Sequence, residues 1–250
     1  YLDRVDPDAV GLGHFRAGEF DDPARIHHRS YHGPGLIDGA GAAGGACKRY
    51  EDAYWLALRR HYLANVAQID EQIGLILDAV RRTLGEETLI VFTCDHGEMM
   101  GNHRLWGKHA CGYEDVTRVP LFVRLPGPQP GRAVDALVSL VDVLPTTLGI
   151  AGIEPPPHDG RDLRQSADEG GHPLAFSEAN GFISATDGRF KYVHFYREEQ
   201  LTELYDLERD PHEYENRIEH ADYARVLASL RASVIDHLIK YGLDHRAPPR

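Results

Sequence analysis

A long apolar periodicity, followed at once by a β-branched run, constrains the fold of this chain more than any other feature. Apolar side chains recur at steps of three and four over residues 50–85, which predicts an amphipathic helix that ends near Gly85. Residues 89–94 then predict a buried strand. A helix that leads directly into a strand is typical of α/β proteins, in which a mostly parallel sheet carries helices on its faces. We therefore expect an α/β fold.

Later segments extend this pattern. Residues 119–125 predict a second strand, and residues 133–153 predict a short strand followed by a helix. Asp142 stands where the N-cap of that helix is expected, and we favour capping over metal binding for its carboxylate. The stretch "EPPPHDGRDLRQSADEGG" breaks the pattern with proline, glycine and charge, which indicates a domain boundary.

The remaining residues predict a smaller antiparallel unit. "ISATDGRFKYVHFY" reads as two strands joined by a type I′ turn at Asp187-Gly188, and residues 203–213 read as a short strand and a turn. Residues 223–242 predict a closing amphipathic helix. We therefore expect an α/β part over residues 1–165 and a small antiparallel α+β subdomain over residues 166–250.

Composition excludes several classes of function. The formal net charge is −12, which argues against nonspecific binding to nucleic acid or to an anionic membrane, since both need a basic face. We expect no membrane span, because no run of about 18 apolar residues occurs. The three cysteines, Cys47, Cys94 and Cys111, include no C-x-x-C pair, so neither a disulfide framework nor a zinc knuckle is expected. Sparse cysteines slightly favour a cytoplasmic location, although a signal peptide would lie upstream of this sequence.

A candidate anion site follows the strand at residues 89–94. Asp95 and His96 come where that strand ends, and ligands of open α/β sheets lie outside the carboxyl ends of strands. A carboxylate beside an imidazole suits a divalent cation, and Gly97 lets the backbone turn sharply. Lys108, in the loop that follows, supplies an ammonium. A cation and a lysine together suit a multiply charged anion, because both stabilise negative oxygens during sulfuryl or phosphoryl transfer.

Local chemistry leaves other interpretations open. Asp95 and His96 would also serve as caps of a surface loop, and two ligands are too few for a cation. Glu98, His103 and His109 lie nearby, but we favour loop or supporting roles for each. The histidine cluster His27, His28 and His32 is expected to be a solvated loop rather than a metal tract.

The run "TCDHGEMMGNHRLWGKHACGYEDVTRVPLFVR" resembles the second metal-binding segment of the sulfatase family, within the alkaline-phosphatase-like superfamily. Further segments resemble the family in the same order along the chain, covering nearly everything from about residue 50 to 220. They are "HYLANVAQIDEQIGLIL", "VSLVDVLPTTLGIAGI", "TDGRFKYV" and "LYDLERDPHEYEN". The resemblance implies part of an alkaline-phosphatase-like sheet with flanking helices and a small C-terminal subdomain.

The resemblance also implies roles. Asp95 and His96 would bind a divalent metal, most often Ca²⁺ and sometimes Mg²⁺ or Mn²⁺, and Lys108 would contact a sulfate oxygen. Family enzymes attack the ester with a formylglycine made from a cysteine or serine in a C-x-P-S-R-like motif. None of the three cysteines lies in such a motif. We therefore expect the C-terminal portion of a sulfatase, inactive alone, whose formylglycine lies in a missing N-terminal part.

Three functions stay open at this point. The first is hydrolysis of a small-molecule sulfate ester, and the second is hydrolysis of a phosphonate monoester or a phosphodiester within the same superfamily. The third is a noncatalytic binding protein that keeps the fold. A homo-oligomer is compatible with all three. A fragment of this kind is expected to expose a sheet edge or face, which is a liability for solubility.

Overall fold

The computed structural model describes residues 1–19, 21, 45–46, 51–108, 111–128, 130–179, 181–196 and 202–241. The chain forms two compact units, Tyr1–His109 with Arg118–Gly131, and Ala110–Thr117 with Arg132–Arg250. Five residues singled out in the sequence lie outside the described residues: His27, His28, His32, Cys47 and His109.

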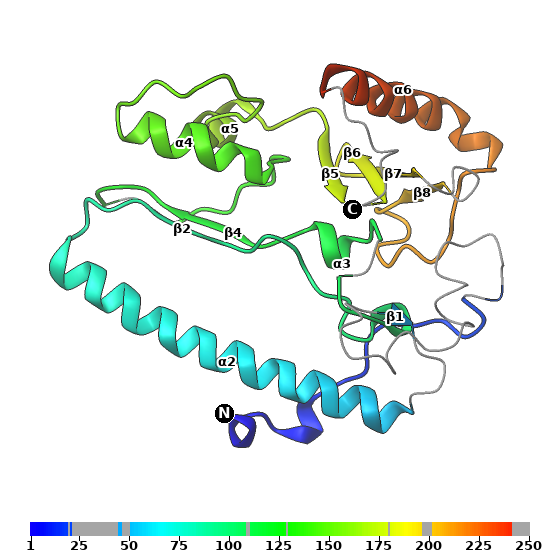
Figure 1. Ribbon diagram of the computed structural model, residues 1–250, viewed down its shortest axis with the longest axis horizontal. Coiled ribbons are helices and arrows are strands. Elements are labelled where there is room, and N and C mark those ends of the chain that lie inside the picture. The colour runs from blue at the N-terminus through cyan, green and yellow to red at the C-terminus, as the bar shows by residue number, and fades with distance from the viewer. Residues whose placement is uncertain are drawn as a thin grey trace, which may run out of the picture. The chain divides into compact units, whose positions relative to one another are not determined.

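The first unit contains the predicted long helix, α2, which covers Asp52–Thr83 (Figure 1). The 3-10 helices η1 (Leu2–Arg4) and η2 (Pro7–Ala9) precede it, and Arg60 of α2 donates to the carbonyl oxygens of Leu2 and Val5 at 3.1 Å. The apolar stripe of α2 is only partly covered. Ile69, Leu75, Ile76 and Leu84 are exposed to between 58% and 65%, so much of the face that predicted the helix meets solvent.

The predicted strands of this unit are β2 (Ile90–Thr93) and β4 (Leu121–Arg124). They pair antiparallel, with Phe92 directly opposite Phe122, so the parallel partner expected for residues 89–94 is absent from the described residues. The reason lies in the connection between the strands. In its described part, residues 94–108 and 111–120, it holds no crossover helix of the first unit that would return the chain in the same direction. The rings of Phe92 and Phe122 are 5.9 Å apart and are 41% and 66% exposed.

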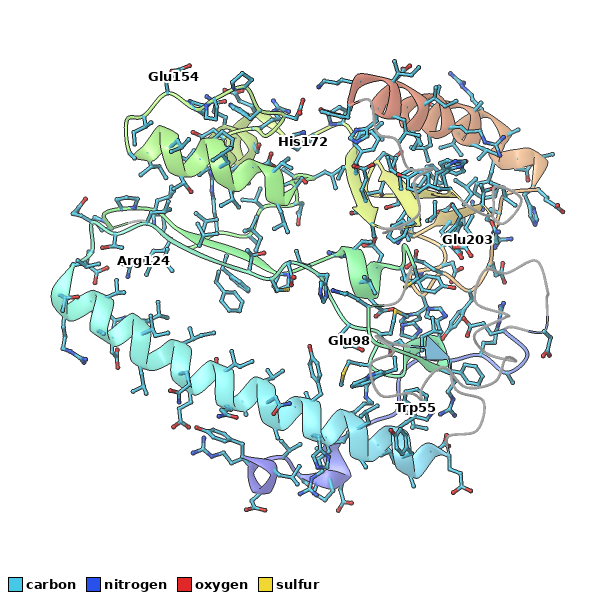
Figure 2. The ribbon with its side chains drawn as sticks, viewed as in Figure 1. Trp55, Glu98, Arg124, Glu154, His172 and Glu203 are labelled. Atoms are coloured by element: carbon cyan, nitrogen blue, oxygen red, sulfur yellow. The ribbon has the colours of Figure 1, made fainter. Side chains whose placement is uncertain are left out.

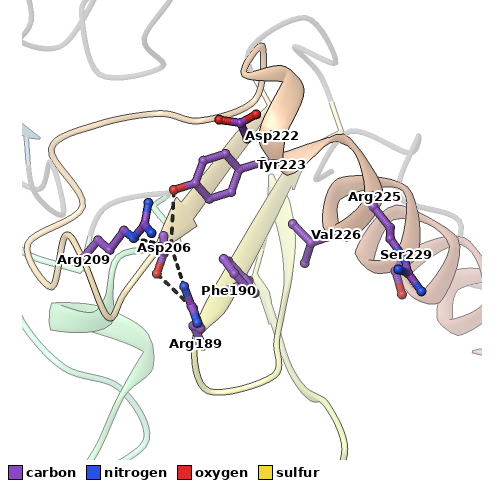
Figure 3. Close-up of a pocket in the computed structure, with 9 residues that line it drawn as sticks. All are labelled: Arg189, Phe190, Asp206, Arg209, Asp222, Tyr223, Arg225, Val226 and Ser229. Carbon is purple, nitrogen blue, oxygen red and sulfur yellow. Dashed lines mark hydrogen bonds and ion pairs between the residues drawn. The ribbon is translucent and has the colours of Figure 1, made fainter.

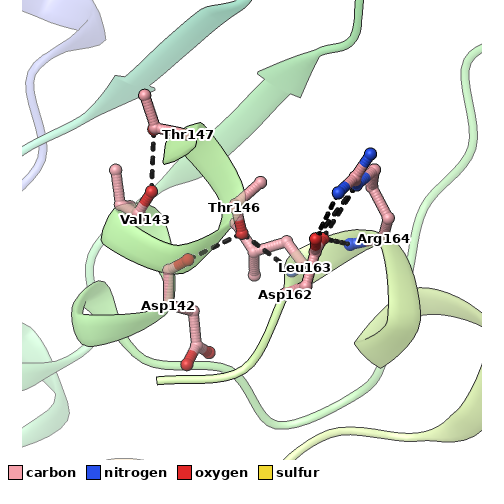
Figure 4. A network of polar contacts seen from close by, with 7 residues as sticks. All are labelled: Asp142, Val143, Thr146, Thr147, Asp162, Leu163 and Arg164. Carbon is pink, nitrogen blue, oxygen red and sulfur yellow. Dashed lines mark hydrogen bonds and ion pairs between the residues drawn. The ribbon is translucent and has the colours of Figure 1, made fainter. Parts of the chain in front are cut away.

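The second unit begins with the one-turn helix α3 (Glu114–Thr117) and continues with η4 (Leu140–Asp142), α4 (Val143–Ile150) and α5 (Leu163–Glu169). Residues 133–139 form no strand, which corrects that prediction. Thr146 links α4 to α5: its hydroxyl donates to the carbonyl of Asp142 and accepts from the backbone N–H of Leu163 (Figure 4). Asp162 caps α5 by accepting from the backbone N–H of Arg164 at 2.9 Å.

Asp142 occupies the position between η4 and α4, but its carboxylate makes no capping bond to α4. It is fully buried, and it accepts hydrogen bonds from the backbone N–H groups of Ser139 (2.9 Å) and Arg161 (2.7 Å). Nε2 of His172 lies 2.7 Å away. The carboxylate therefore joins three segments of the second unit and closes the capping box of η4, rather than capping the helix that was predicted.

A four-stranded antiparallel sheet in the order β5-β6-β7-β8 follows. Its strands are β5 (Ala175–Ala179), β6 (Phe182–Thr186), β7 (Phe190–Phe195) and β8 (Glu203–Asp206). Helix α6 (Ala224–Tyr241), preceded by η6 (Ala221–Tyr223), packs on the sheet and confirms the predicted closing helix (Figure 1). The core between them contains Ile183, Ala185, Tyr192, Leu204, Leu230 and Val234.

The β6–β7 hairpin has the predicted Asp187-Gly188 turn, but it is not of type I′. A type I′ turn needs positive φ at both central residues. Gly188 has a φ of +93°, but the φ of Asp187 is not positive. Asp187 instead accepts from the backbone N–H groups of Arg189 and Phe190, which closes a wider loop. The boundary expected between residues 165 and 166 stays a prediction, although α5 runs across it. None of the described helices combines the length and apolar character that a membrane span requires.

Candidate functional site

The loop that leads from β2 toward β4 is tightly shaped by its own backbone. Met100, His103 and Arg104 have φ between 51° and 54°, and Gly101 and Gly107 have φ of 85° and 79°. Left-handed backbone is costly for residues with a Cβ and persists only where the surroundings enforce it. The 3-10 helix η3 (Asn102–Arg104) and the short strand β3 (Leu105–Trp106), which pairs with β1 (Gly45–Ala46), lie in this loop.

Helix α2 supplies much of that support. A Cβ on Gly101 would lie 3.0 Å from Cε3 of Trp55, so the indole packs directly against the glycine backbone. Figure 2 labels Trp55 on α2. Arg59 donates to the carbonyl of Met100 at 2.6 Å, and Arg104 forms an ion pair with Asp52 at 2.5 Å. These contacts hold residues 100–104 on the helix, while Gly107 donates to Glu98 and thereby brings residue 108 beside residues 95–98.

Asp95, His96 and Lys108 come together, as the sequence predicts. Nζ of Lys108 is 3.2 Å from Nε2 of His96, and Oδ2 of Asp95 is 3.6 Å from the same nitrogen. The Asp95 side chain is 86% exposed and that of His96 is 37% exposed, so a ligand from solvent reaches both. Oδ1 of Asp95 accepts from the backbone N–H of His96 at 3.0 Å, which turns the carboxylate back over the imidazole.

The tautomer of His96 follows from its neighbours. Nδ1 lies 2.8 Å from the carbonyl oxygen of Gly97, and a carbonyl only accepts, so Nδ1 carries the proton. Nε2 therefore presents its lone pair, to which the ammonium of Lys108 donates. A proton fixed on Nδ1 and a lone pair on Nε2 make up the state in which histidine binds metals.

Two of the other nearby candidates, Glu98 and His103, make contacts within the protein, and the supporting roles favoured for them stay predictions. Glu98 accepts from the backbone N–H of Gly107 at 2.5 Å and from that of Met100 at 3.3 Å, so its carboxylate closes the loop. His103 is fully buried, and its Nδ1 contacts the carboxylate of buried Glu19. Cys94 is exposed and directly precedes Asp95.

Tyr62 of α2 is a feature of this region that the sequence did not reveal. Burial raises the pKa of its hydroxyl, and the neighbouring Glu98 and Cys94 raise it further. Its hydroxyl stays protonated at neutral pH and is available as a donor near the carboxylates of the loop.

The donor set fits a divalent cation. One carboxylate and one neutral imidazole nitrogen, both reachable from solvent and adjacent in the chain, are ligands that such cations accept. Two protein ligands do not complete a coordination sphere. Asp95 and His96 thus fit as part of a site rather than as a whole one.

Comparison with known proteins decides the family. Residues 19–153, which include Asp95, His96 and Lys108, match the family described as Sulfatase. The chain belongs to the sulfatase family. A second match, to the family described as N-sulphoglucosamine sulphohydrolase, C-terminal, covers residues 175–240 and so takes in the β5–β8 sheet and α6.

Individual sulfatases resemble the chain over most of its length. It is 33% identical to the Uncharacterized sulfatase YidJ of Escherichia coli (strain K12), over 69% of this chain and 36% of that protein. It is 32% identical to the Delta 4,5-hexuronate-2-O-sulfatase of Bacteroides thetaiotaomicron, over 75% of this chain and 43% of that protein. This sulfatase chain therefore spans well under half the length of these curated relatives.

A solved structure extends the similarity to the fold. The phosphonate monoester hydrolase SpPMH from Silicibacter pomeroyi superimposes with a TM-score of 0.76 and 26% identity, over 94% of this chain and 51% of that one. Structures of sulfatases superimpose comparably, which confirms the α/β, alkaline-phosphatase-like assignment of this sulfatase chain. Sulfatases generally use a divalent metal.

Proposed function

We propose that Asp95, His96 and Lys108 form the anion-binding part of a sulfate ester hydrolase, which becomes complete in a full-length protein with a formylglycine nucleophile. The observation that carries the proposal is that Nζ of Lys108 and Oδ2 of Asp95 both lie within 3.6 Å of Nε2 of His96, at a place that solvent reaches. Membership in the sulfatase family supports the reaction, and the relatives' full lengths supply room for the nucleophile segment.

Asp95 and His96 would hold a divalent cation, which we propose is Ca²⁺, with Mg²⁺ and Mn²⁺ as the next choices. When bound, such a cation stabilises negative charge on ester oxygens as a Lewis acid. His96 is oriented for this by its bond to the Gly97 carbonyl, and Asp95 by the backbone N–H of His96. Asp95 and His96 do not complete the coordination of such a cation, so other parts of the full-length protein would supply its remaining ligands.

Lys108 would donate from its ammonium to a non-bridging oxygen of the sulfate group. Its flexible stem and exposed position let it leave Nε2 of His96 and reach an anion beside the imidazole. A charged donor fixed beside the reacting group stabilises the charge that develops in the transition state. The substrate class we propose is a small sulfated molecule such as a sulfated sugar, in keeping with the name of the Bacteroides relative.

Turnover by a full-length protein tests the proposal. Its hydrolysis of 4-nitrophenyl sulfate should fall about 100- to 1,000-fold in kcat/KM for Lys108→Ala, on the scale of losing one charged transition-state donor. Lys240→Ala, an exposed lysine of the second unit that pairs with Asp159, is the matched control and should leave the rate unchanged. Turnover that is independent of Lys108 would refute the assignment.

Hydrolysis of a phosphonate monoester is the second candidate. The superposition on SpPMH favours it, because the same fold with a TM-score of 0.76 carries that activity by name. Comparing 4-nitrophenyl sulfate with 4-nitrophenyl phenylphosphonate separates the two, and we expect the sulfate to be the better substrate. Absence of turnover on both esters by a protein with an intact formylglycine would favour a noncatalytic role.

A further inference from the structure

A pocket of about 550 Å³ opens on the second unit, and arginine side chains line it together with aromatic and apolar groups (Figure 3). The β6–β7 turn, the strands β7 and β8, and the η6–α6 segment contribute its walls. None of Asp95, His96 and Lys108 belongs to it, and all three lie in the other unit. The pocket is therefore separate from the candidate site, and any ligand of the pocket needs an argument from its own lining.

The guanidinium of Arg189 is held rigidly in this wall. Asp206, which is 1% exposed, accepts from its Nε at 3.3 Å and from its Nη2 at 3.2 Å. Glu208 binds Nη1 at 2.8 Å, and the guanidinium carbon lies 4.7 Å from the centre of the Phe190 ring. Burial opposes the charge on Asp206, but the hydrogen bonds from Arg189 hold the pKa of its carboxyl below the usual value. Asp206 thus anchors the half-exposed guanidinium of Arg189 in the pocket wall through two hydrogen bonds.

The apolar part of the pocket is equally ordered. The rings of Phe190 and Tyr223 meet edge to face at 6.1 Å, and the Tyr223 hydroxyl donates to Asp206 at 3.3 Å. Val226 lines the pocket beside them. An aromatic and aliphatic surface fixed beside charged groups suits a ligand with an apolar face and polar edges.

The charges of the lining favour an anion with hydroxyl groups. Arg189, Arg209 and Arg225 line the pocket, whereas the chain as a whole carries a net charge of −12. The negative charge of Asp206 is turned inward to Arg189 and Tyr223, and its Oδ2 also lies 3.8 Å from Nε of Arg209, whose side chain is 69% exposed and so still open to a ligand. Asp222 also lines the pocket and offers an acceptor for a hydroxyl donor. A bare inorganic anion would gain nothing from Asp222 or from the aromatic rings, but a sugar would use both.

We propose that this pocket is a second binding site, which takes an acidic sugar: a sugar residue that carries a sulfate or carboxylate group. The anionic group would accept from Arg209 and Arg225, and the sugar ring would lie against Phe190 and Tyr223. The inference goes beyond the proposed function, since it concerns binding by the second unit and requires no hydrolysis.

Calorimetric titration of the 250-residue chain with three disaccharides tests the proposal. The probes are a sulfated chondroitin disaccharide, its unsulfated counterpart, which keeps the uronate carboxylate, and neutral maltose. We expect both anionic probes, or the sulfated one alone, to bind more tightly than maltose, and the pattern identifies the anionic group. Replacing both arginines, Arg209→Gln with Arg225→Gln, should weaken that binding about tenfold or more, on the scale of lost charge-assisted hydrogen bonds.

Two control variants make the outcome specific. Arg81→Gln changes an exposed arginine of α2 that pairs with Asp78, and Lys240→Ala changes an exposed lysine of the second unit that pairs with Asp159. Neither should alter disaccharide affinity. Three outcomes would each overturn the proposal. The first is equal affinity for maltose and the anionic probes, and the second is no binding of any probe at 10 mM, about tenfold above the millimolar affinity scale. The third is binding that is lost in Lys108→Ala but kept in the double arginine variant. Loss of ester hydrolysis in Lys108→Ala bears only on the proposed function.

Discussion

The ammonium of Lys108 donates to Nε2 of His96 across 3.2 Å, and this is the same lone pair that a divalent cation would use. The two roles proposed for this cluster, cation binding and anion binding, therefore compete for one nitrogen in the structure as it stands. Occupation of His96 by a cation requires Lys108 to move away, which frees the ammonium for an anion.

Removing that ammonium should strengthen cation binding. We expect Lys108→Met in the 250-residue chain to bind Mn²⁺ about 30-fold more tightly than the unaltered chain, because a unit charge about 4 Å from a divalent ion costs about 2 kcal/mol in a water-like surrounding. Manganese electron paramagnetic resonance measures the free ion directly. Lys108→Arg keeps the charge and should leave the affinity near its original value. Equal or weaker binding by Lys108→Met would show that the lysine does not compete.

A buried acidic cluster in the second unit predicts how stability depends on pH. Lys191 and Glu213 are each 1% exposed and lie 2.5 Å apart, and Glu114 contacts the same ammonium at 3.1 Å. Burial raises the pKa of Glu213 to about 7 in spite of Lys191. Two carboxylates share one buried ammonium, so a proton on one of them relieves the excess negative charge.

The folded state therefore holds this proton more tightly than the unfolded chain does. Stability from Glu213 is fully present below about pH 4.5 and is lost as pH rises through about 7, and the loss is about 3 kcal/mol at most. Urea unfolding gives the free energy of unfolding at pH 5 and at pH 8. Between these pH values, that free energy should fall less for Glu213→Gln than for the unaltered chain. The same loss in both would assign the pH dependence to other groups.

The contact between Gly101 and Trp55 predicts the effect of a single methyl group. Gly101→Ala should destabilise the chain by about 2–4 kcal/mol, because it adds left-handed strain and drives a Cβ to within 3.0 Å of the indole. Gly85 has a similar φ of +74° but open space around it, so Gly85→Ala should cost only about 1 kcal/mol. Thermal unfolding measures the stability of both variants. Similar losses of stability would mean that the Trp55 indole shifts at little cost to make room for the methyl group.

The exposed aromatic pair on β2 and β4 predicts self-association. Phe122 is 66% exposed and faces Phe92 across the strand pair. We expect Phe122→Thr, which keeps the strand preference but removes the ring, to lower aggregation of the chain in light-scattering measurements. Ile153→Thr removes a 55% exposed side chain at another position and should change little. A similar effect of both substitutions would point to general apolarity rather than to this strand pair.

Elements with a strong local pattern could be predicted from the sequence. The repeat of α2 and the apolar runs of β2 and β4 predicted helix and strand correctly, since those signals lie within a few residues. Elements without such a signal were missed, and β5 and α5 are the longest of these. β5 has the sequence AFSEA, with no β-branched residue, and α5 lies within a stretch dominated by proline, glycine and charge.

The candidate site shows the same division. Asp95, His96 and Lys108 were found because they lie within 14 positions and follow a strand. Their support was not found, because Trp55 and Arg59 act from α2, about 40 residues away in sequence. Asp142 was likewise assigned a local cap, whereas its partner His172 lies 30 residues away. Contacts at such separations leave no periodic trace in the sequence.

The course of the chain through its two units has a consequence for recombination. Residues 110–117 belong to the second unit, yet they lie between two stretches of the first. A crossover after residue 131 would exchange the β5–β8 sheet and α6 but leave Glu114, a partner of Lys191, with the original parent. Chimaeras of sulfatases joined at that point should leave the buried charge at position 191 without a matching carboxylate at position 114, unless both parents have the same residues at these two positions.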